Sequence, residues 1–251
     1  MRRTGGILRL VLKERYKSPT LELMVPAIVV GNVFIPAYLE RGGFQLYGLV
    51  LAFIPLINVS ETATFALALR NVVFVTVEHL YQGYLASFLT MPISRLRFFV
   101  YTYFADVLFP LLIYWAVEAL YLLSSGLLDP YSLSMLIIFT AGYLFSSNFL
   151  LAVSILVRSP GASVLTTGFS LGSIFIGGGI AEYYLITTDR VSSLPVISWT
   201  NPYVAAVAET VLHGGKAAAV AASLTVGVVA DVVLAIILLA FSIWQFVRVD
   251  L

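Results

Sequence analysis

The chain has 251 residues, of which 60% are hydrophobic and only 11% are charged, with a formal net charge of +1. This composition lies far outside that of soluble globular domains and indicates a protein whose solvent is the lipid bilayer. The sequence has no basic cluster interleaved with aromatic residues, so nothing in it indicates a nucleic-acid partner. It also has no cysteine, which excludes a disulfide, a thiolate metal site and a cysteine nucleophile.

The first twenty residues are basic and amphipathic. Arg2, Arg9, Lys13 and Lys17 share one edge of a helical wheel, and the apolar residues within 7–11 lie away from it. This pattern predicts a helix over residues 1–20 that lies in the membrane interface, with its basic side chains at anionic headgroups. The alternative is a frayed basic tail that only sets the orientation of the protein.

Six apolar segments are each long enough to cross a bilayer, which takes roughly 20 helical residues. They cover residues 21–39, 46–77, 98–123, 133–157, 162–180 and 217–246. The second is too long for a simple span, so its last turns, beyond Arg70, are expected to project into the cytoplasm. Pro110 predicts a kink in the third. The sequence therefore predicts an all-α integral membrane protein with six transmembrane helices in a single domain, residues 1–251.

Residues 181–216, before the last span, are too polar to cross the membrane and too aromatic to be a plain linker. Asn201 is placed to cap a helix, Pro202 suits a first helical position and Gly214 follows the expected end. We therefore expect a short extracellular or re-entrant helix over residues 202–212, lying on the outer membrane surface or dipping back into it.

The lysine and arginine residues set the orientation. With the N-terminus inside and six spans, eleven of the fourteen basic residues lie on the inner side and three, Arg41, Arg190 and Lys216, on the outer side. The positive-inside rule then favours a multi-pass protein of the cell (plasma) membrane with both termini in the cytoplasm. Residues 78–97 are expected in the cytoplasm as well.

Four acidic residues fall within the predicted spans, where an ionised carboxylate costs on the order of 3 kcal/mol or more: Glu61, Asp106, Glu118 and Asp231. Glu61, near the middle of the second span, is the strongest candidate to contact a substrate or to handle protons. Its alternative role is to fix helix packing through a neighbouring hydroxyl group. The other three are expected nearer the membrane edges, where a structural role is favoured.

Residues 168–172 match both a G-x-S-x-G nucleophile motif and the small-residue spacing of packed membrane helices. The nucleophile interpretation needs a preceding strand and a partner histidine, whereas His79 and His213 both fall in predicted loops. We therefore expect close helix packing by Gly168 and Gly172, and unwinding of the outer end of the fifth span at residues 177–179. No phosphate-binding loop is present, so the chain is not expected to hydrolyse ATP by itself.

A polar motif separates the second and third predicted spans. Glu78 and Gly83 are followed by the run Leu-Thr-Met-Pro-Ile-Ser-Arg, which contains Pro92, Ser94 and Arg95. This run resembles the signature of ABC type 2 transporter permeases, in which an acidic residue and a glycine end the second span and a proline-containing turn opens the third.

A second resemblance to the same family falls late in the chain. Pro195, then Asn201 and Pro202, and finally Gly214 are similar to its last extracellular segment, where asparagine-proline starts a short helix that closes at a glycine. The chain departs from the family beside Glu78, where a basic residue is common, and near Glu209, where the family has an arginine. These departures leave the subfamily, and with it the substrate, open.

The resemblance implies the membrane subunit of an ABC exporter. A separate ATPase subunit would bind ATP and Mg, and a second permease chain, identical or related, would complete the transport path for an amphiphilic drug, lipid, glycan or peptide. Residues 84–90 would form a cytoplasmic coupling helix, and the residues implied to face the ATPase are Glu78, His79, Gly83, Tyr84, Pro92, Ser94 and Arg95. The alternative is that residues 78–97 are an ordinary solvated loop.

Candidates for the substrate pathway are Glu61, Asp106, Phe53 and Phe65, the phenylalanines because aromatic side chains suit an apolar cavity. An ion-coupled secondary transporter or channel that uses Glu61 and Asp106 as a proton relay is the main alternative function. A membrane scaffold or assembly factor that transports nothing is the second.

Overall fold

The computed structural model describes residues 2–17, 20–30, 59–82, 93–126, 128, 130–211 and 217–248. Within these residues the chain is helical and contains no strand, which confirms the predicted all-α class. The elements, with η2 and η3 as π-helical turns and η4 and η5 as 3-10 turns, are α1 (Arg2–Arg15), α2 (Thr20–Val29), α5 (Val59–Asn71), η2 (Val72–Val77), α6 (Glu78–Tyr81), α8 (Arg95–Tyr103), η3 (Phe104–Leu108), α9 (Phe109–Ser125), α10 (Pro130–Val157), α11 (Pro160–Thr187), η4 (Val191–Val196), η5 (Ser198–Thr200), α12 (Pro202–Val211) and α13 (Ala217–Arg248).

Five helical segments in the described part of the chain are long and apolar enough to cross a membrane. They correspond to the second to sixth predicted spans and run over Ser60–Tyr81, Arg95–Ser124, Ser132–Val157, Pro160–Thr187 and Val220–Arg248. The protein is therefore a membrane-embedded, multi-pass helical protein. Of the first predicted span only α2 and Val30 are described, so the total of six remains a prediction.

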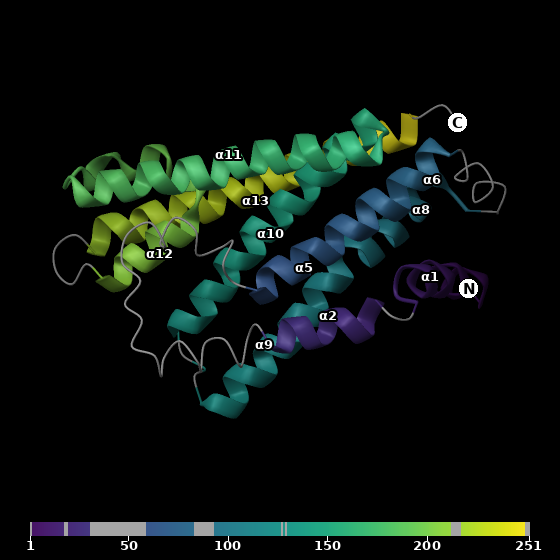
Figure 1. Ribbon diagram of the computed structural model, residues 1–251, viewed down its shortest axis with the longest axis horizontal. Helices are drawn as coiled ribbons and strands as arrows, with labels where there is room; N and C mark the ends of the chain where they lie inside the picture. The colour runs from purple at the N-terminus through teal and green to yellow at the C-terminus, as the bar shows by residue number, and fades with distance from the viewer. Residues whose placement is uncertain are drawn as a thin grey trace.

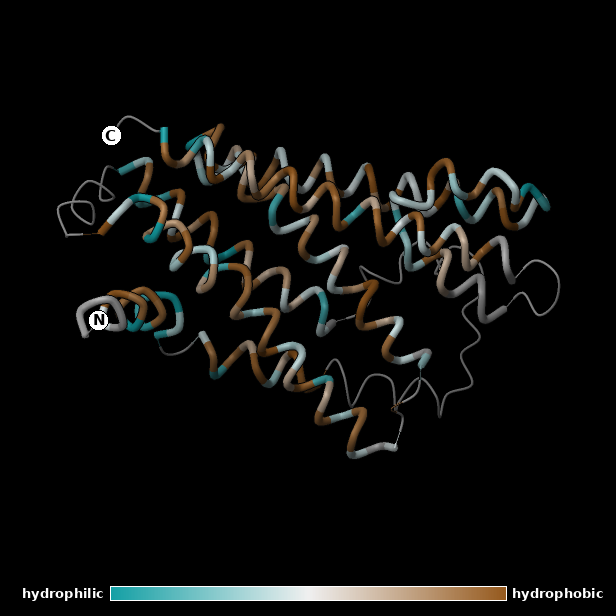
Figure 2. The backbone as a smooth tube through the Cα atoms, turned by 180° about the vertical axis from the view of Figure 1, so that it is seen from behind, coloured by the Kyte–Doolittle hydropathy of each residue, from teal (hydrophilic) through white to brown (hydrophobic). Residues whose placement is uncertain are grey.

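The long helices lie roughly alongside one another, whereas α1 is seen nearly end-on in the same view and so runs across the bundle (Figure 1). The N-terminus, α6, the start of α8 and the C-terminus share one end of the molecule, and α12 lies at the other. Seen from behind, the same grouping of the termini is evident, and hydrophobic and hydrophilic residues both occur around the turns of α1 (Figure 2).

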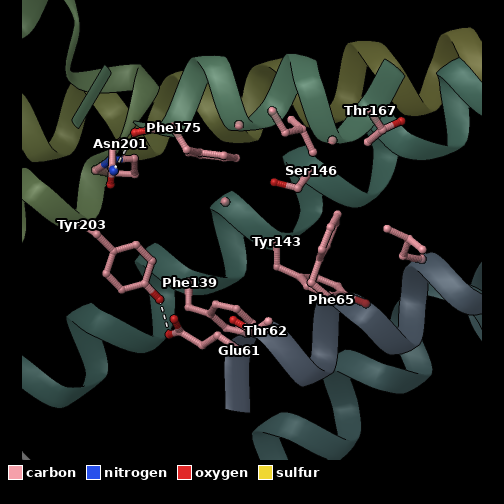
Figure 3. A pocket seen from close by; sticks show the side chains of 16 residues that line it. Glu61, Thr62, Phe65, Phe139, Tyr143, Ser146, Thr167, Phe175, Asn201 and Tyr203 are labelled. Carbon is pink, nitrogen blue, oxygen red and sulfur yellow. Dashed lines mark hydrogen bonds between the residues drawn. The ribbon is translucent and has the colours of Figure 1, made fainter. Parts of the chain in front are cut away.

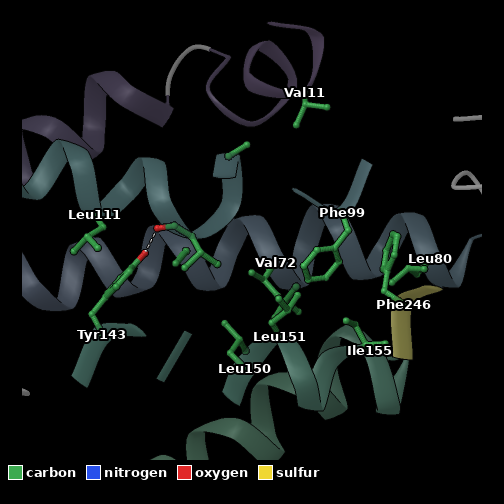
Figure 4. Packing of buried hydrophobic residues seen from close by; sticks show 14 of the residues in the cluster. Val11, Val72, Leu80, Phe99, Leu111, Tyr143, Leu150, Leu151, Ile155 and Phe246 are labelled. Atoms are coloured by element: carbon green, nitrogen blue, oxygen red, sulfur yellow. Dashed lines mark hydrogen bonds between the residues drawn. The ribbon is translucent and has the colours of Figure 1, made fainter. Parts of the chain in front are cut away.

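A shared apolar core joins α1 to the bundle (Figure 4). Val11, on α1, belongs to the same buried cluster as Leu80 on α6, Phe99 on α8, Ile155 on α10 and Phe246 on α13. Arg9 and Lys13, on the predicted basic edge, are exposed. The amphipathic helix predicted at the N-terminus is therefore present, and its buried side faces protein.

Two predicted helix ends are wrong. The second span continues beyond Arg70 and residue 77 to Tyr81, and Val72, Val73 and Val77 are fully buried in its π-helical turn; that these turns lie on the cytoplasmic side stays a prediction. A run of valines supplies the apolar surface that keeps this turn inside the protein. The fifth span likewise continues to Thr187, so the first part of the 181–216 segment is helical.

The glycines at 177–179 do not unwind α11, contrary to expectation. The Thr200 side chain occupies the space where a Cβ on Gly178 would stand, and on α13 a Cβ on Gly227 would lie 2.5 Å from the Ser198 carbonyl oxygen. The two glycines therefore let the η5 turn approach both helices closely. Their missing side chains serve packing, while the surrounding helix remains intact.

Pro110 lies in the first turn of α9, directly after the π-helical turn η3. A proline ring within a helix clashes with the carbonyl group four residues earlier and removes one backbone hydrogen bond. The wider π-helical turn before Pro110 accommodates both effects. Where the sequence predicts a kink in this span, the structure has a change from π-helix to α-helix directly before Pro110.

Replacing Gly227 by alanine should destabilise the protein, because the added methyl group would meet backbone that cannot rotate away. We expect the free energy of unfolding of Gly227→Ala to fall by about 1–3 kcal/mol, measured by denaturant titration of the purified protein. Gly161→Ala is the matched control, since nothing lies within 4 Å of its Cβ position. Equal stability of Gly227→Ala and the wild type would contradict this packing arrangement.

Candidate functional site

A cavity of about 260 Å³ lies among α5, α10, α11 and the start of α12 (Figure 3). Most of its wall is apolar or aromatic; Glu61, Asn201 and Tyr203 lie toward the end where α12 begins, and Ser146 and Thr167 lie away from it. The residues that line it include Glu61, Phe65, Phe139, Phe175, Asn201 and Tyr203. The structure thus brings together Glu61, Phe65, Asn201 and Pro202, four residues that the sequence singled out separately.

Glu61 forms the polar end of this cavity. Its side chain is only 6% exposed, the Tyr203 hydroxyl donates a hydrogen bond to its Oε1 atom, and Tyr114 lies beside the same carboxyl group. Asn201 holds the start of α12 in place, because its amide donates to the Phe175 carbonyl oxygen on α11 at 3.1 Å. The segment before the last span therefore reaches back and closes one end of the cavity.

Gly168 and Gly172 do not pack against another helix within the described residues, contrary to prediction, since nothing lies within 4 Å of their Cβ positions. Together with Gly142 they line the cavity. The four-residue spacing correctly places Gly168 and Gly172 on one face of α11, but spacing alone does not tell whether that face meets a helix or an open space. The missing side chains leave room for a ligand.

Asp106 lies elsewhere, in a buried ion pair with Arg15 of α1. Arg15 Nε donates to Asp106 Oδ1 at 2.7 Å, and both side chains are only 2% exposed. Thr76 donates to the other carboxylate oxygen of Asp106 and accepts from Arg15 Nη2 at 3.0 Å. Asp106 does not line the cavity, and its two oxygens hold α1 against η2 and η3. The structural role that the sequence favoured for this acid fits its position, and a place on the substrate pathway stays a prediction.

Backbone and side-chain hydrogen bonds extend this joint. Arg70 donates to the Arg15 carbonyl oxygen at 2.6 Å, and Asn71 donates to the Tyr16 hydroxyl at 3.0 Å. Tyr16 donates in turn to the Ala105 carbonyl oxygen at 2.6 Å. Burial, and after it the nearby Asp106 carboxylate, raises the pKa of Tyr16 above its ordinary value, so the hydroxyl stays protonated and keeps donating. We call the contacts among residues 14–16, 70–71, 76, 79 and 105–106 the N-terminal joint.

The predicted coupling residues are described in part. His79 Nε2 lies 3.3 Å from Glu14 Oε1 in the N-terminal joint, and Glu78 accepts a hydrogen bond from Gln82. Ser94 caps α8 by accepting from the Arg97 backbone N–H, and Arg95 donates to the Val247 carbonyl oxygen at 3.1 Å. The remaining predicted positions, Gly83, Tyr84, Pro92, Phe53 and Gly214, lie outside the described residues.

Pro195 lies within the 3-10 turn η4, next to the fully buried Leu194, and does not line the cavity. Leu194 packs in a small separate cluster with Val191, Ala205 and Val220. Pro195 therefore helps to shape the turn that leads into α12, and its contribution to the cavity is indirect.

Sequence reasoning missed one buried acid and misplaced another. The sequence places Glu182 in the segment before the last span and Asp231 near a membrane edge. Both side chains are fully buried in the protein, Glu182 within α11 and Asp231 midway along α13. None of their four carboxyl oxygens has a hydrogen-bond partner among the described residues, and the two groups lie close enough for their charges to interact. No group of three or more His, Cys, Asp or Glu side chains in the described part of the chain could hold a metal ion.

Comparison with known proteins gives no relative: no protein-family model, no curated protein and no solved structure matches this chain.

Removing either partner of the Arg15–Asp106 pair should be strongly destabilising, because the other charge would stay buried without compensation. We expect Asp106→Leu or Arg15→Met to lower the free energy of unfolding by about 3–5 kcal/mol each, measured by denaturant titration. The double variant Arg15→Met/Asp106→Leu should lose much less free energy of unfolding than the sum of the losses in the two single variants. Additive losses in this cycle would contradict a direct interaction.

Proposed function

We propose that this chain is the membrane subunit of an ABC exporter. It acts with a separate ATPase subunit, which binds ATP and Mg, and with a second permease chain that is identical or related. The observation that carries the proposal is the N-terminal joint, which fastens α1 to both helices that flank residues 83–92. Glu14 contacts His79 on α6, and Arg15 pairs with Asp106 in the span that begins at α8. An ATPase that pushes on this end would move α1 and both flanking helices together.

The distribution of charge supports placing this end in the cytoplasm. Arg9 and Lys13 on α1, Arg95 at the start of α8 and Arg248 at the end of α13 gather where Figure 1 shows the N-terminus, α6, α8 and the C-terminus. Arg190 follows the opposite end of α11. The positive-inside rule then assigns the basic end to the cytoplasm, where an ATPase subunit would be available.

One continuous helical segment links the proposed ATPase contact to the cavity. Ser60–Tyr81 runs without a break through α5, η2 and α6, with Glu61 in the cavity at its start and His79 in the N-terminal joint near its end. Residues twenty positions apart along a helix are separated by roughly 30 Å. Movement at the cytoplasmic end would therefore reach the cavity through a single rigid element, which supports coupling of ATP hydrolysis to release of an amphiphilic substrate.

The geometry gives less support to an ion-coupled transporter that uses Glu61 and Asp106 as a relay. Glu61 lines the cavity, whereas both oxygens of Asp106 are engaged by Arg15 and Thr76 in the N-terminal joint. Transport by the purified chain alone in liposomes, driven by a pH gradient, would select this alternative. Absence of transport in liposomes, both with and without the ATPase, would favour the other alternative, a membrane scaffold or assembly factor that transports nothing.

The exposed end of α6 should contact the ATPase subunit directly. Tyr81 is 69% exposed beside residues 83–92, and replacing it with the photo-crosslinking residue p-benzoylphenylalanine keeps an aromatic ring there. In native membranes, illumination should link this position to an ABC ATPase, recognised by mass spectrometry through its phosphate-binding loop and ABC signature sequence.

Tyr184 is the matched control for this experiment. It is 55% exposed and lies in the last turn of α11, toward the opposite end of the bundle, so the same replacement there should give no ATPase adduct. Adducts at Tyr184 alone, or none at either position while the ATPase is present in the membrane, would contradict the proposed coupling surface.

A further inference from the structure

Among the described residues, the groups that hold the Glu61 carboxyl group are neutral. Tyr203 donates to Oε1 and Tyr114 lies beside it, and among the described residues no lysine, arginine or histidine lines the cavity. The two described basic residues within this span, Arg70 and His79, both lie in the N-terminal joint, where Arg70 donates to the Arg15 carbonyl oxygen and His79 lies beside Glu14. A buried carboxylate is stable when a cation lies beside it, and the described part of the chain supplies none to this cavity.

Three other acidic side chains lie near the cavity. Glu118 lies close enough for its charge to act on Glu61. Asp231 lies just behind the cavity wall, with Oδ2 3.9 Å from the Cβ position of the lining residue Gly142, and Glu182 interacts electrostatically with Asp231. The acidic groups near the cavity, with no described basic residue in its lining, suit a positively charged ligand better than a negatively charged one.

The wall of the cavity suits the same ligand. Figure 3 shows the rings of Phe65, Phe139, Tyr143 and Phe175 around the space that ends at Glu61 and Tyr203. Aromatic faces attract an ammonium group and also cover an apolar body, which is the usual way in which proteins recognise quaternary ammonium compounds. The volume, about 260 Å³, is near the lower limit for ligand sites and fits a small aromatic or aliphatic ammonium group.

We propose that this cavity binds the cationic group of an amphiphile, with Glu61 as its counter-ion and the surrounding rings as the seat of its apolar part. The inference deepens the proposed export function by naming the class of substrate. Binding itself requires neither the ATPase nor ATP, so the two proposals fail separately.

The test uses three probes of one shape in the absence of any ATPase. Benzyltrimethylammonium is the cation, neopentylbenzene is its uncharged carbon isostere, and benzylsulfonate is a similar anion. The full chain is placed in phosphatidylcholine nanodiscs, which carry no net charge, and bound probe is measured by equilibrium dialysis with empty nanodiscs subtracted. The cation should bind at least about tenfold more tightly than either of the others.

Glu61→Gln separates charge from shape. This variant should weaken binding of benzyltrimethylammonium by about tenfold or more and leave neopentylbenzene unchanged. Glu61→Asp should keep the preference for the cation. Glu22→Gln, which removes an exposed acid on α2 that does not line the cavity, should bind all three probes as the wild type does.

Equal binding of the cation and its carbon isostere by the wild type would overturn the proposal, even if Glu61→Gln failed to fold. So would full cation binding by a folded Glu61→Gln protein, shown by an unchanged circular dichroism spectrum. Cation-selective binding that Glu61→Gln abolishes would support the inference even if no ATPase partner were found, in which case only the export function would fall.

Discussion

The ion pair between Arg15 and Asp106 is the interaction on which the arrangement of the molecule depends. The two side chains are removed from water, so the pair depends on Thr76 and Glu14, which bind the remaining donors of Arg15 and the second carboxylate oxygen of Asp106. Together with the apolar contacts of Val11, it fastens α1 to the bundle. The contact between Arg15 and Asp106 therefore decides whether a force applied to α1 reaches the membrane-embedded helices.

The opposite end of the bundle is organised by glycines and by one asparagine. Gly178 and Gly227 let the η5 turn approach α11 and α13, and Asn201 then fixes the start of α12 to the Phe175 carbonyl group. This arrangement places the Tyr203 hydroxyl against Glu61 and closes one end of the cavity. The continuous segment Ser60–Tyr81 connects that closed end with the N-terminal joint, so the two features belong to one mechanical path.

Apolar runs predicted five of the long helices, because roughly twenty apolar residues in a bilayer have few alternatives to a helix. Pro202 correctly marked the start of α12, since its fixed backbone angle suits a first helical position. The Asn201 side chain, predicted to cap this helix, donates to the Phe175 carbonyl oxygen on α11. The Arg15–Asp106 pair could not be predicted in this way: its members are 91 positions apart, and only the packing of α1 across the bundle brings them together. Gly168 and Glu182 were misjudged for the same reason, because the face of a helix that meets a neighbour is set by tertiary structure.

The attachment of α1 can be measured by the distance between spin labels in the full chain, which has no native cysteine to remove. Labels on Lys13→Cys and Leu96→Cys would report on two exposed positions, one on α1 and one on α8. In nanodiscs the wild-type background should give one narrow distance distribution, and adding Asp106→Asn should broaden it. A broad distribution in the wild-type background, or one that Asp106→Asn leaves unchanged, would show that the ion pair does not hold this helix in place.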